Sequence, residues 1–413
     1  MSQNHIRTFE LACGMPLVVE PFPTAGSAAI AWLLPLGSAC YPDPQDGLAP
    51  MLAELMMRGV EGLDSRQHSD ALDRLGVQRS VHVSTYHLHL GAVVLGSKLE
   101  ESLPLVAAMV RSPSLPESAL EPTRSLCLQS LEGLDDDPQE LAMVRLKERH
   151  LPPPLNRHSY GRRDVLESCP LDAIRSAWRR GCVPVGSVLA VAGRCDPDRV
   201  ASQMERLLAG WEGEWIEPVP TAAAVRGHLH LPDETAQTHL GLAWEAPREG
   251  EPGSMAERIA VRVLGGGSSS RLFSEVREKR GLCYSVGASY TNSLRHAMVT
   301  VYAGSTPQRA QQTVDVIMEQ VRSMRHGVSA AEFHRAVAGF KSRLVMQGES
   351  TSARSATLAS DQFRLGRPRS LAEIAAEVDR LTQADLDAWV AQRVVPDPTL
   401  VAIGPAPVEV RPQ

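Results

Sequence analysis

The chain has 413 residues, of which 43% are hydrophobic and 22% charged, and its formal net charge is -6. This composition is typical of a soluble globular protein long enough for two domains, and it disfavours nucleic-acid binding, which rewards a basic surface. The seven cysteines are irregularly spaced and form no C-x-x-C motif, so we expect neither a disulfide framework nor a thiolate zinc site.

The N-terminal residues lack the basic start and the apolar core of a secretory signal. The most apolar early segment, residues 28–39, is too short for a membrane span, which needs about 20 residues, and it predicts a buried strand instead. We therefore expect a cytoplasmic protein without a membrane segment.

Residues 47–59, GLAPMLAELMMRG, predict an amphipathic helix, because their apolar side chains recur at helical spacing. Further strands are predicted at 27–37, 87–95, 238–246, 297–305 and 399–404. Further helices are predicted at 102–112, 198–211, 307–324 and 370–381. Strands and helices are interleaved without strict β-α-β alternation, which favours an α+β sandwich with helices on one face of a sheet.

Two segments repeat each other without a gap, from Trp178 to Gly193 and from Trp389 to Gly404. Each predicts a helix end, a short turn with proline, and an apolar strand that ends in glycine. Their placement near the ends of the two halves indicates two tandem domains of one architecture. Residues 210–227 are rich in glycine, proline and small residues, and they predict the boundary between the two domains. We expect domains at 1–210 and 228–413, joined by a linker at 211–227.

Residues 268–286, SSSRLFSEVREKRGLCYSV, predict a helix with Leu272, Phe273 and Val276 facing inward. Gly281 stands where a helix C-terminus favours a residue that can adopt positive φ. The basic side chains of Arg277, Lys279 and Arg280 lie near this C-terminus, where the negative end of the helix dipole favours cations.

Few patterns in the chain indicate chemistry on their own. No G-x-S-x-G nucleophile elbow is present, and no two histidines stand one helical turn apart as a helical zinc site requires. Two H-x-H pairs, His87/His89 and His228/His230, lie in predicted strands, where alternate residues share a face. Either pair could chelate a metal, but solvated or cross-strand-paired histidines are the more common arrangement.

Several segments resemble those of the M16 (pitrilysin-like, or inverzincin) metallopeptidases, and the resemblance extends along nearly the full length. The segments are 37–62, 131–142, 158–168, 188–197, 236–244 and, most specifically, LGGGSSSRLFSEVREKRGLCYSV at 264–286. In this family a pair of similar α+β domains forms the fold, as the internal repeat indicates independently.

Active members of that family carry H-x-x-E-H on the early helix. Matched to this chain, the first histidine falls on Pro50, the catalytic glutamate on Ala53 and the second histidine on Glu54. The third ligand, a glutamate, falls near Ser130. Proline and alanine offer no donor atom, and one carboxylate does not hold zinc. The resemblance therefore implies that this chain binds no catalytic zinc and has no peptidase activity alone.

Active members also use an arginine and a tyrosine, seven residues apart in the second domain, to contact the substrate at the scissile bond. These positions match Arg277 and Tyr284. Some members divide the work between two related chains, and this sequence resembles the metal-free chain of such a pair. The resemblance implies a heterodimer with an H-x-x-E-H-bearing M16 paralogue that holds the zinc, with peptides as substrates. A homodimer of the isolated chain stays open.

Three other functions stay open at this stage. The family includes relatives that became scaffolding, such as core subunits of respiratory complexes, in which Arg277 and Tyr284 would be unused. A peptide-binding protein could capture extended peptides by strand addition. An independent enzyme would need a different site, such as the H-x-H pairs.

Overall fold

The structure is a computed structural model that describes residues 6–43, 45–394 and 397–411. Its contacts divide the chain into two compact units whose segments are interleaved in sequence. The first unit comprises Met1–Gly133, Pro153–Thr221 and Gln347–Ser370, and the second comprises Leu134–Pro152, Ala222–Met346 and Leu371–Gln413. The linear domain boundaries and the linker at 211–227 stay predictions, because this division follows contacts rather than sequence order.

The first unit is built on a six-stranded sheet with the order β1-β2-β8-β3-β7-β6. Its strands are β1 (Arg7–Glu10), β2 (Pro16–Pro21), β3 (Ser27–Leu34), β6 (Gln78–Val83), β7 (Leu88–Leu95) and β8 (Val188–Gly193). β2 and β8 are parallel, and every other neighbouring pair is antiparallel. A two-stranded ribbon of β4 (Gly59–Val60) and β5 (Leu63–Asp64) stands apart from this sheet.

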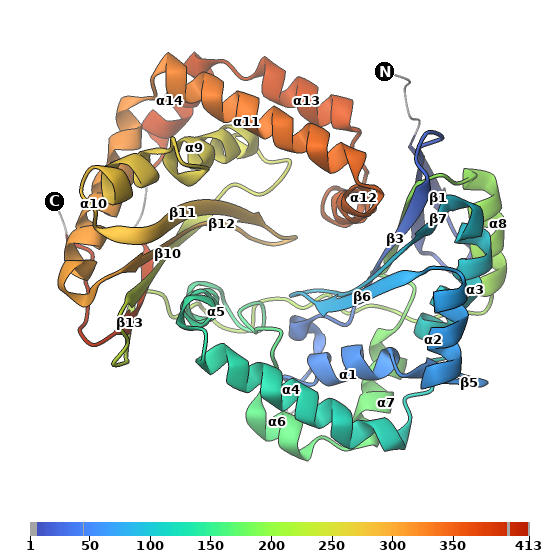
Figure 1. The fold of residues 1–413 in the computed structure, drawn as a ribbon. Coiled ribbons are helices and arrows are strands. Elements are labelled where there is room, and N and C mark those ends of the chain that lie inside the picture. The colour runs from blue at the N-terminus through green and yellow to red at the C-terminus, as the bar shows by residue number, and fades with distance from the viewer. Residues whose placement is uncertain (1–5, 44, 395–396, 412–413) are drawn as a thin grey trace. The chain divides into compact units, whose positions relative to one another are not determined.

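Helices cover both faces of this sheet. They are α1 (Ala49–Met56), α2 (Ser65–Arg74), α3 (Leu99–Arg111), most of α4 (Leu120–Asp135), α6 (Arg163–Ser168), α7 (Leu171–Gly181), α8 (Pro197–Leu207) and α12 (Thr351–Leu365). The larger core lies between the sheet and the helices that include α1, α3, α7 and α8. α12 lies against the opposite face, on β3 and β8 (Figure 1).

The second unit has a five-stranded sheet with the order β11-β12-β10-β13-β9. Its strands are β9 (His228–Pro232), β10 (Thr238–Ala246), β11 (Cys283–Asn292), β12 (Ala297–Ser305) and β13 (Thr399–Gly404). β9 and β13 are parallel, and the other neighbours are antiparallel. Its helices are α5 (Pro138–His150), α9 (Ser254–Gly265), α10 (Ala310–Ser323), most of α11 (Ala330–Glu349), α13 (Leu371–Arg380) and α14 (Gln383–Gln392).

The second sheet shares its topology with five strands of the first, β2, β8, β3, β7 and β6, which confirms the predicted α+β fold with two similar domains. The expectation of helices on one face only was wrong, because α12 and α5 cover the second face of each sheet. β8 lies between a parallel and an antiparallel neighbour in the first unit, and β13 does so in the second. The repeated segments therefore correspond to α7 with β8 and to α14 with β13. All six residues of each of these strands are buried, because both faces of each strand are covered.

One helix of each unit comes from the other half of the sequence. α5, from the N-terminal half, packs Ala142 and Leu146 against Val401 and Ile403 of β13. In Figure 1, α5 lies on the face of the second sheet opposite α9 and α10. α12, from the C-terminal half, packs Leu358 and Ala359 against the first sheet.

Residues 131–142, one of the segments that resemble the family, do not form one continuous helix, because α4 ends at Asp135 and α5 begins at Pro138. Pro138 lacks an amide hydrogen, and it occupies the first turn of α5, where that donor is not needed. Asp137 caps the new helix by accepting a hydrogen bond from the Glu140 amide at 3.1 Å. The interruption lets α5 join the second unit while most of α4 belongs to the first.

A buried ion pair fixes α12 on the first sheet. The guanidinium of Arg354 donates to the carboxylate of Glu20 on β2, and the two side chains are 1% and 4% exposed. Arg354 also donates to the Arg369 carbonyl at 2.6 Å, in the segment that follows α12. These partners lie far apart in sequence, so the contact depends on the complete fold.

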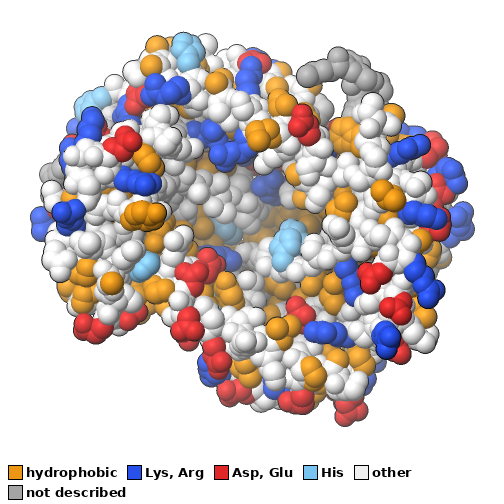
Figure 2. All heavy atoms as spheres, viewed as in Figure 1, with side chains coloured by type: hydrophobic (Ala, Val, Ile, Leu, Met, Phe, Trp, Pro, Cys, Tyr) orange, Lys and Arg blue, Asp and Glu red, His pale blue; other side chains and the backbone are white. Residues whose placement is uncertain are grey.

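Acidic and basic side chains are interspersed over the face of the molecule drawn in Figure 2. Among the described residues, no helix is both long enough and apolar enough to cross a lipid bilayer.

Replacing Glu20 with alanine should lower the free energy of unfolding by about 3–5 kcal/mol, because it leaves the Arg354 cation buried without its carboxylate. Urea unfolding followed by circular dichroism measures this loss. The matched control is Glu100→Ala, which removes an exposed pair with Arg199 and should cost at most about 1 kcal/mol. Equal losses in the two variants would contradict the role given to the buried pair.

Candidate functional site

The early helix is present as α1, with the four metal-site positions on α1 and α4. Pro50 lies in the first turn of α1, a position that suits proline. Ala53 is 4% exposed and belongs to the apolar core of the first unit. Glu54 forms an ion pair with Arg58, one turn further along, at 3.5 Å. The only carboxylate of this helix therefore already has a cationic neighbour.

A turn of the chain covers the start of α1 beside Pro50. A Cβ atom on Gly161 would lie 3.1 Å from Cγ of Pro50 and 2.6 Å from the Gly47 carbonyl oxygen. Gly161 has a φ of 85°, a conformation that glycine adopts without strain. An ion pair between Asp46 and Arg157, 3.1 Å long, also joins the segment before α1 to the segment that leads to this turn. The space beside residue 50 is thus filled by closely packed backbone.

Ser130 carries a hydroxyl rather than the carboxylate that the third zinc ligand would need. Its hydroxyl donates to the Leu126 carbonyl one turn earlier on α4, at 3.0 Å. Cys127 lies between these two residues and is buried, and burial together with the nearby Glu54 carboxylate raises the pKa of its thiol to about 12.

These residues do not fit a zinc ion. Zinc sites use three or four nitrogen, sulfur or carboxylate ligands, whereas here only Glu54 presents a carboxylate. Within residues 6–43, 45–394 and 397–411, no cluster of three or more histidine, cysteine, aspartate or glutamate side chains is arranged to hold a metal.

The H-x-H pairs serve other contacts. His87 is buried and its Nε2 lies 3.0 Å from the Gly186 carbonyl oxygen. The His89 ring stacks on His82 of the neighbouring strand, with centroids 4.3 Å apart. Burial lowers the pKa of His87 to about 4 and that of His89 to about 3. In the other pair, His230 Nε2 lies 2.8 Å from the Gly404 carbonyl oxygen, and His228 is exposed.

Arg277 and Tyr284, predicted to act together, lie side by side in the second unit. The guanidinium carbon of Arg277 is 5.2 Å from the centroid of the Tyr284 ring, within the range of a cation–π contact. Tyr284 is 78% exposed. No hydrogen bond or ion pair joins the Arg277 guanidinium or the Tyr284 hydroxyl to any other part of the described chain. Both groups are therefore available to a ligand.

Two local irregularities produce this arrangement. Phe273–Glu278 forms a π-helical turn in place of the predicted regular helix, and such turns are frequent at functional sites. The pairing of β11 with β12 shifts register between Cys283 and Ser285. Tyr284 is therefore the extra residue of a β-bulge, a device that redirects a side chain.

Phe273 contributes to the site in a way that the sequence analysis missed. We expected it to face inward with Leu272 and Val276, but it is only partly buried, whereas those two are 0% exposed. The Arg277 guanidinium lies 4.6 Å from its ring centroid. The signal was present, since an aromatic residue four positions before an arginine shares its side of a helix.

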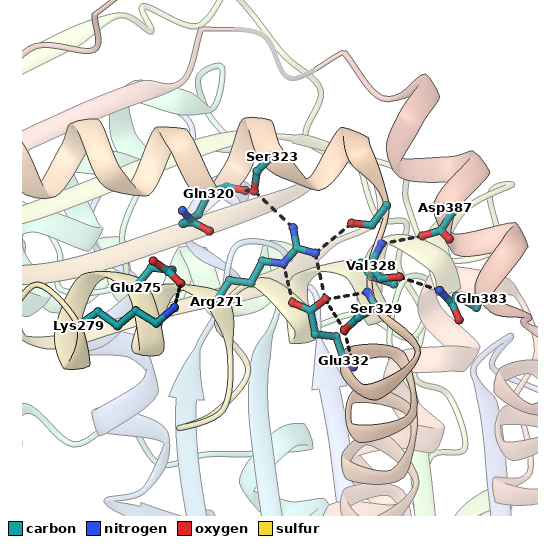
Figure 3. A network of polar contacts seen from close by, with 11 residues as sticks. Arg271, Glu275, Lys279, Gln320, Ser323, Val328, Ser329, Glu332, Gln383 and Asp387 are labelled. Atoms are coloured by element: carbon teal, nitrogen blue, oxygen red, sulfur yellow. Dashed lines mark hydrogen bonds and ion pairs between the residues drawn. The ribbon is translucent and has the colours of Figure 1, made fainter.

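Arg271 anchors the segment that carries this site (Figure 3). Its Nε donates to Glu332 at 2.7 Å and its Nη2 to the same carboxylate at 3.1 Å, while Nη1 donates to the Ser323 hydroxyl at 3.3 Å. Burial alone would raise the pKa of Glu332, but hydrogen bonds from Arg271 and Ser329 lower it to about 2. Nearby, Lys279 and Arg280 both pair with Glu275, each at 2.6 Å.

Comparison with known proteins places these features in a family. A family profile described as "Insulinase (Peptidase family M16)" matches residues 17–159, and one described as "Peptidase M16 inactive domain" matches residues 169–340. The chain belongs to the M16 peptidase family. The α1 positions lie within the first match, and the Arg277–Tyr284 pair lies within the second.

Curated M16 relatives align over almost the whole chain. An "uncharacterized zinc protease", YmxG of Bacillus subtilis, is 24% identical over 97% of this chain and 98% of its own length. A second protein with that description, from Mycobacterium tuberculosis, is 27% identical over 92% of this chain and 89% of its own length.

Solved structures share the fold. A peptidase M16 inactive domain from Pseudomonas fluorescens has a TM-score of 0.87 at 20% identity, with 98% of this chain and 99% of that chain covered. A protease from Helicobacter pylori has a TM-score of 0.88 at 18% identity, with coverage of 97% and 100%. A chain of complex III2 from Candida albicans has a TM-score of 0.82 at 16% identity, with coverage of 97% and 96%.

The Glu332 interactions predict how stability depends on pH. The ordinary pKa of 4.5 falls to about 2 in the folded chain, so the stabilisation is complete above about pH 4.5 and is lost as the pH falls toward 2. Arg271→Met should lower the free energy of unfolding at pH 7 by about 2–3 kcal/mol. This deficit should shrink as the pH falls from 4.5 to 2.

Urea unfolding of both proteins across this pH range measures the effect. Arg335→Met is the matched control, since Arg335 is an exposed arginine of the same unit, and it should change stability by less than about 0.5 kcal/mol at every pH. A deficit for Arg271→Met that stays constant with pH would contradict the account.

Proposed function

We propose that this chain is the metal-free subunit of a two-chain M16-type zinc peptidase. In this proposal, a paralogue with an intact H-x-x-E-H helix holds the zinc, and Arg277 and Tyr284 of this chain bind the peptide substrate. The subunit has no peptidase activity alone. The single observation that carries the proposal is the close pair of Arg277 and Tyr284, whose polar groups have no partner among the described residues, in a chain whose metal-site positions hold unsuitable residues.

The chemistry of the pair suits the carbonyl group of a peptide. An arginine N–H and a phenol O–H are both hydrogen-bond donors, and donors directed at a carbonyl oxygen stabilise the negative charge that develops on it during hydrolysis. Arg277 is already held against the rings of Phe273 and Tyr284. Less side-chain freedom is therefore lost when a substrate binds.

The residues at the metal-site positions support a role in which this chain contributes substrate contacts to the zinc site of a partner chain. Pro50 and Ala53 supply no ligand or base, and the turn at Gly161 packs against Pro50. The curated relatives carry the name zinc protease, while one solved structure of the same fold is called an inactive domain. We propose a cytoplasmic location for the assembly and no nucleic-acid partner.

A scaffold is the second candidate, because a chain of complex III2 from Candida albicans has the same fold. In a scaffold, the Arg277–Tyr284 pair would be idle and its replacement would leave the assembly unchanged. A companion gene with an intact H-x-x-E-H motif would favour the peptidase, whereas a companion from a respiratory complex would favour the scaffold.

The test is to purify the chain together with an H-x-x-E-H-bearing M16 paralogue from the same cell and to assay hydrolysis of a peptide library. Arg277→Ala should lower kcat/KM of the mixture by about 100-fold or more, because it removes a donor to the developing charge. Tyr284→Phe should lower it by about 10-fold or more, since only a hydroxyl donor is lost.

Arg335→Ala is the control, because it removes an exposed arginine of the same unit. Its kcat/KM should equal that of the unmodified mixture. If Arg277→Ala and Tyr284→Phe both kept the full rate, the proposed role would be wrong.

A further inference from the structure

The four edge strands of the two sheets differ in how they are protected. Natural sheets commonly blunt their edges with charged residues, proline or short length. β1 has four residues, including Arg7 and Glu10, and β6 has six residues, including Arg79. β9 has five residues and ends in Pro232. β11 is different, since its ten residues, CYSVGASYTN, include no charged residue and no proline. β11 is therefore a long edge strand without the features that commonly prevent an edge from pairing with another chain.

The outer side of β11 has unused hydrogen-bonding capacity. In the sheet order, β11 is terminal and pairs with β12 alone among the described strands. The alternate amide and carbonyl groups of an edge strand that point away from its partner can pair with another extended chain. An added strand that runs antiparallel to β11 would form the slightly more stable type of ladder.

The Arg277–Tyr284 pair stands at the start of this edge. Tyr284 is the second residue of β11 and occupies its bulge. The carboxyl end of an antiparallel strand lies beside the amino end of its neighbour. A peptide added to β11 in this way would therefore place its C-terminal carboxylate next to Tyr284 and Arg277.

The charges at this end suit a carboxylate. Arg277 contacts the aromatic rings of Phe273 and Tyr284 and pairs with no described carboxylate. A planar guanidinium offers several N–H donors that match the two oxygens of a carboxylate. The nearby Glu275 does not compete, because Lys279 and Arg280 both pair with it. Arg309 adds a further cation, which donates to the Gly281 carbonyl.

We propose that the β11 edge and the Arg277–Tyr284 pair together form a binding site for the C-terminal end of an extended peptide. The main chain of the peptide adds to β11 as an antiparallel strand, and Arg277 binds the terminal carboxylate. This inference rests on the proposed function insofar as both require peptide at Arg277, and the terminal carboxylate takes the place there that the proposed function gives to a peptide carbonyl. It goes further by naming the class of ligand: peptides with a free carboxyl terminus.

The experiment measures peptide binding to the isolated chain by fluorescence anisotropy. The probe is a fluorescein-labelled hexapeptide, Gly-Ser-Val-Thr-Val-Ala, prepared as the free acid, as the C-terminal amide, and as the free acid with alternate backbone nitrogens methylated. We expect the free acid to bind at least about 10-fold more tightly than the amide, since the amide loses the charge-assisted contact to Arg277. Backbone methylation should weaken binding by a similar factor, because it removes ladder hydrogen bonds.

Three variants separate recognition from folding. Arg277→Ala should bind acid and amide equally, and Arg277→Lys should keep only part of the preference, because lysine retains the charge but not the planar fork. Arg335→Ala should behave as the unmodified chain. Thermal unfolding of each variant checks that it is folded, and Arg277→Lys provides a second test if Arg277→Ala is not.

Equal affinities for acid and amide, or a preference that persists without Arg277, would overturn the carboxylate site. Unchanged binding of the methylated peptide would overturn strand addition. If the acid preference were absent while hydrolysis by the two-chain mixture still required Arg277, only this inference would fail. If the preference were present while hydrolysis did not require Arg277, the proposed peptidase role would fail and the peptide site would stand.

Discussion

The fold depends on covering both faces of an interior strand in each sheet, β8 in the first and β13 in the second. Alternate side chains of β13 point to opposite faces, with Leu400 and Ala402 in the large core and Val401 and Ile403 on the other side. Burying apolar surface contributes about 25 cal/mol per Å², so neither face is left to water. The chain meets this requirement by exchange, since α5 covers the second sheet and α12 covers the first. Each half therefore completes the other's fold.

This exchange explains why a chain with a degenerate metal helix still keeps an ordered second unit. The first unit accommodates Pro50 and Ala53 as packing residues, because proline suits a helix start and alanine suits a core. The second unit gains α5 from the first half of the sequence, and this packing does not depend on which metal ligands α1 carries. The residues at 50 and 53 thus need not affect the π-helical turn and the bulge that bring Arg277 and Tyr284 together.

Much of this architecture could be predicted from local sequence patterns. The repeat from Trp178 to Gly193 and from Trp389 to Gly404 identified equivalent helix–strand pairs, because period and turn residues are local signals. The helix exchange could not be predicted, since the Glu20–Arg354 contact joins residues 334 positions apart and depends on tertiary packing. At the site, the residue types at 277 and 284 followed from a family resemblance. The π-helical turn, the bulge and the contact with Phe273 required coordinates, because register and helix period depend on neighbouring strands.

The central claim is that zinc belongs to a partner and peptide contacts belong to this chain. Native mass spectrometry of the isolated chain, of the H-x-x-E-H-bearing paralogue and of their complex tests it most directly, because it counts metal ions and subunits in one measurement. The account predicts a heterodimer with one zinc, supplied by the paralogue, and no zinc on this chain after incubation with the metal and buffer exchange. One tightly held zinc on the isolated chain would contradict it.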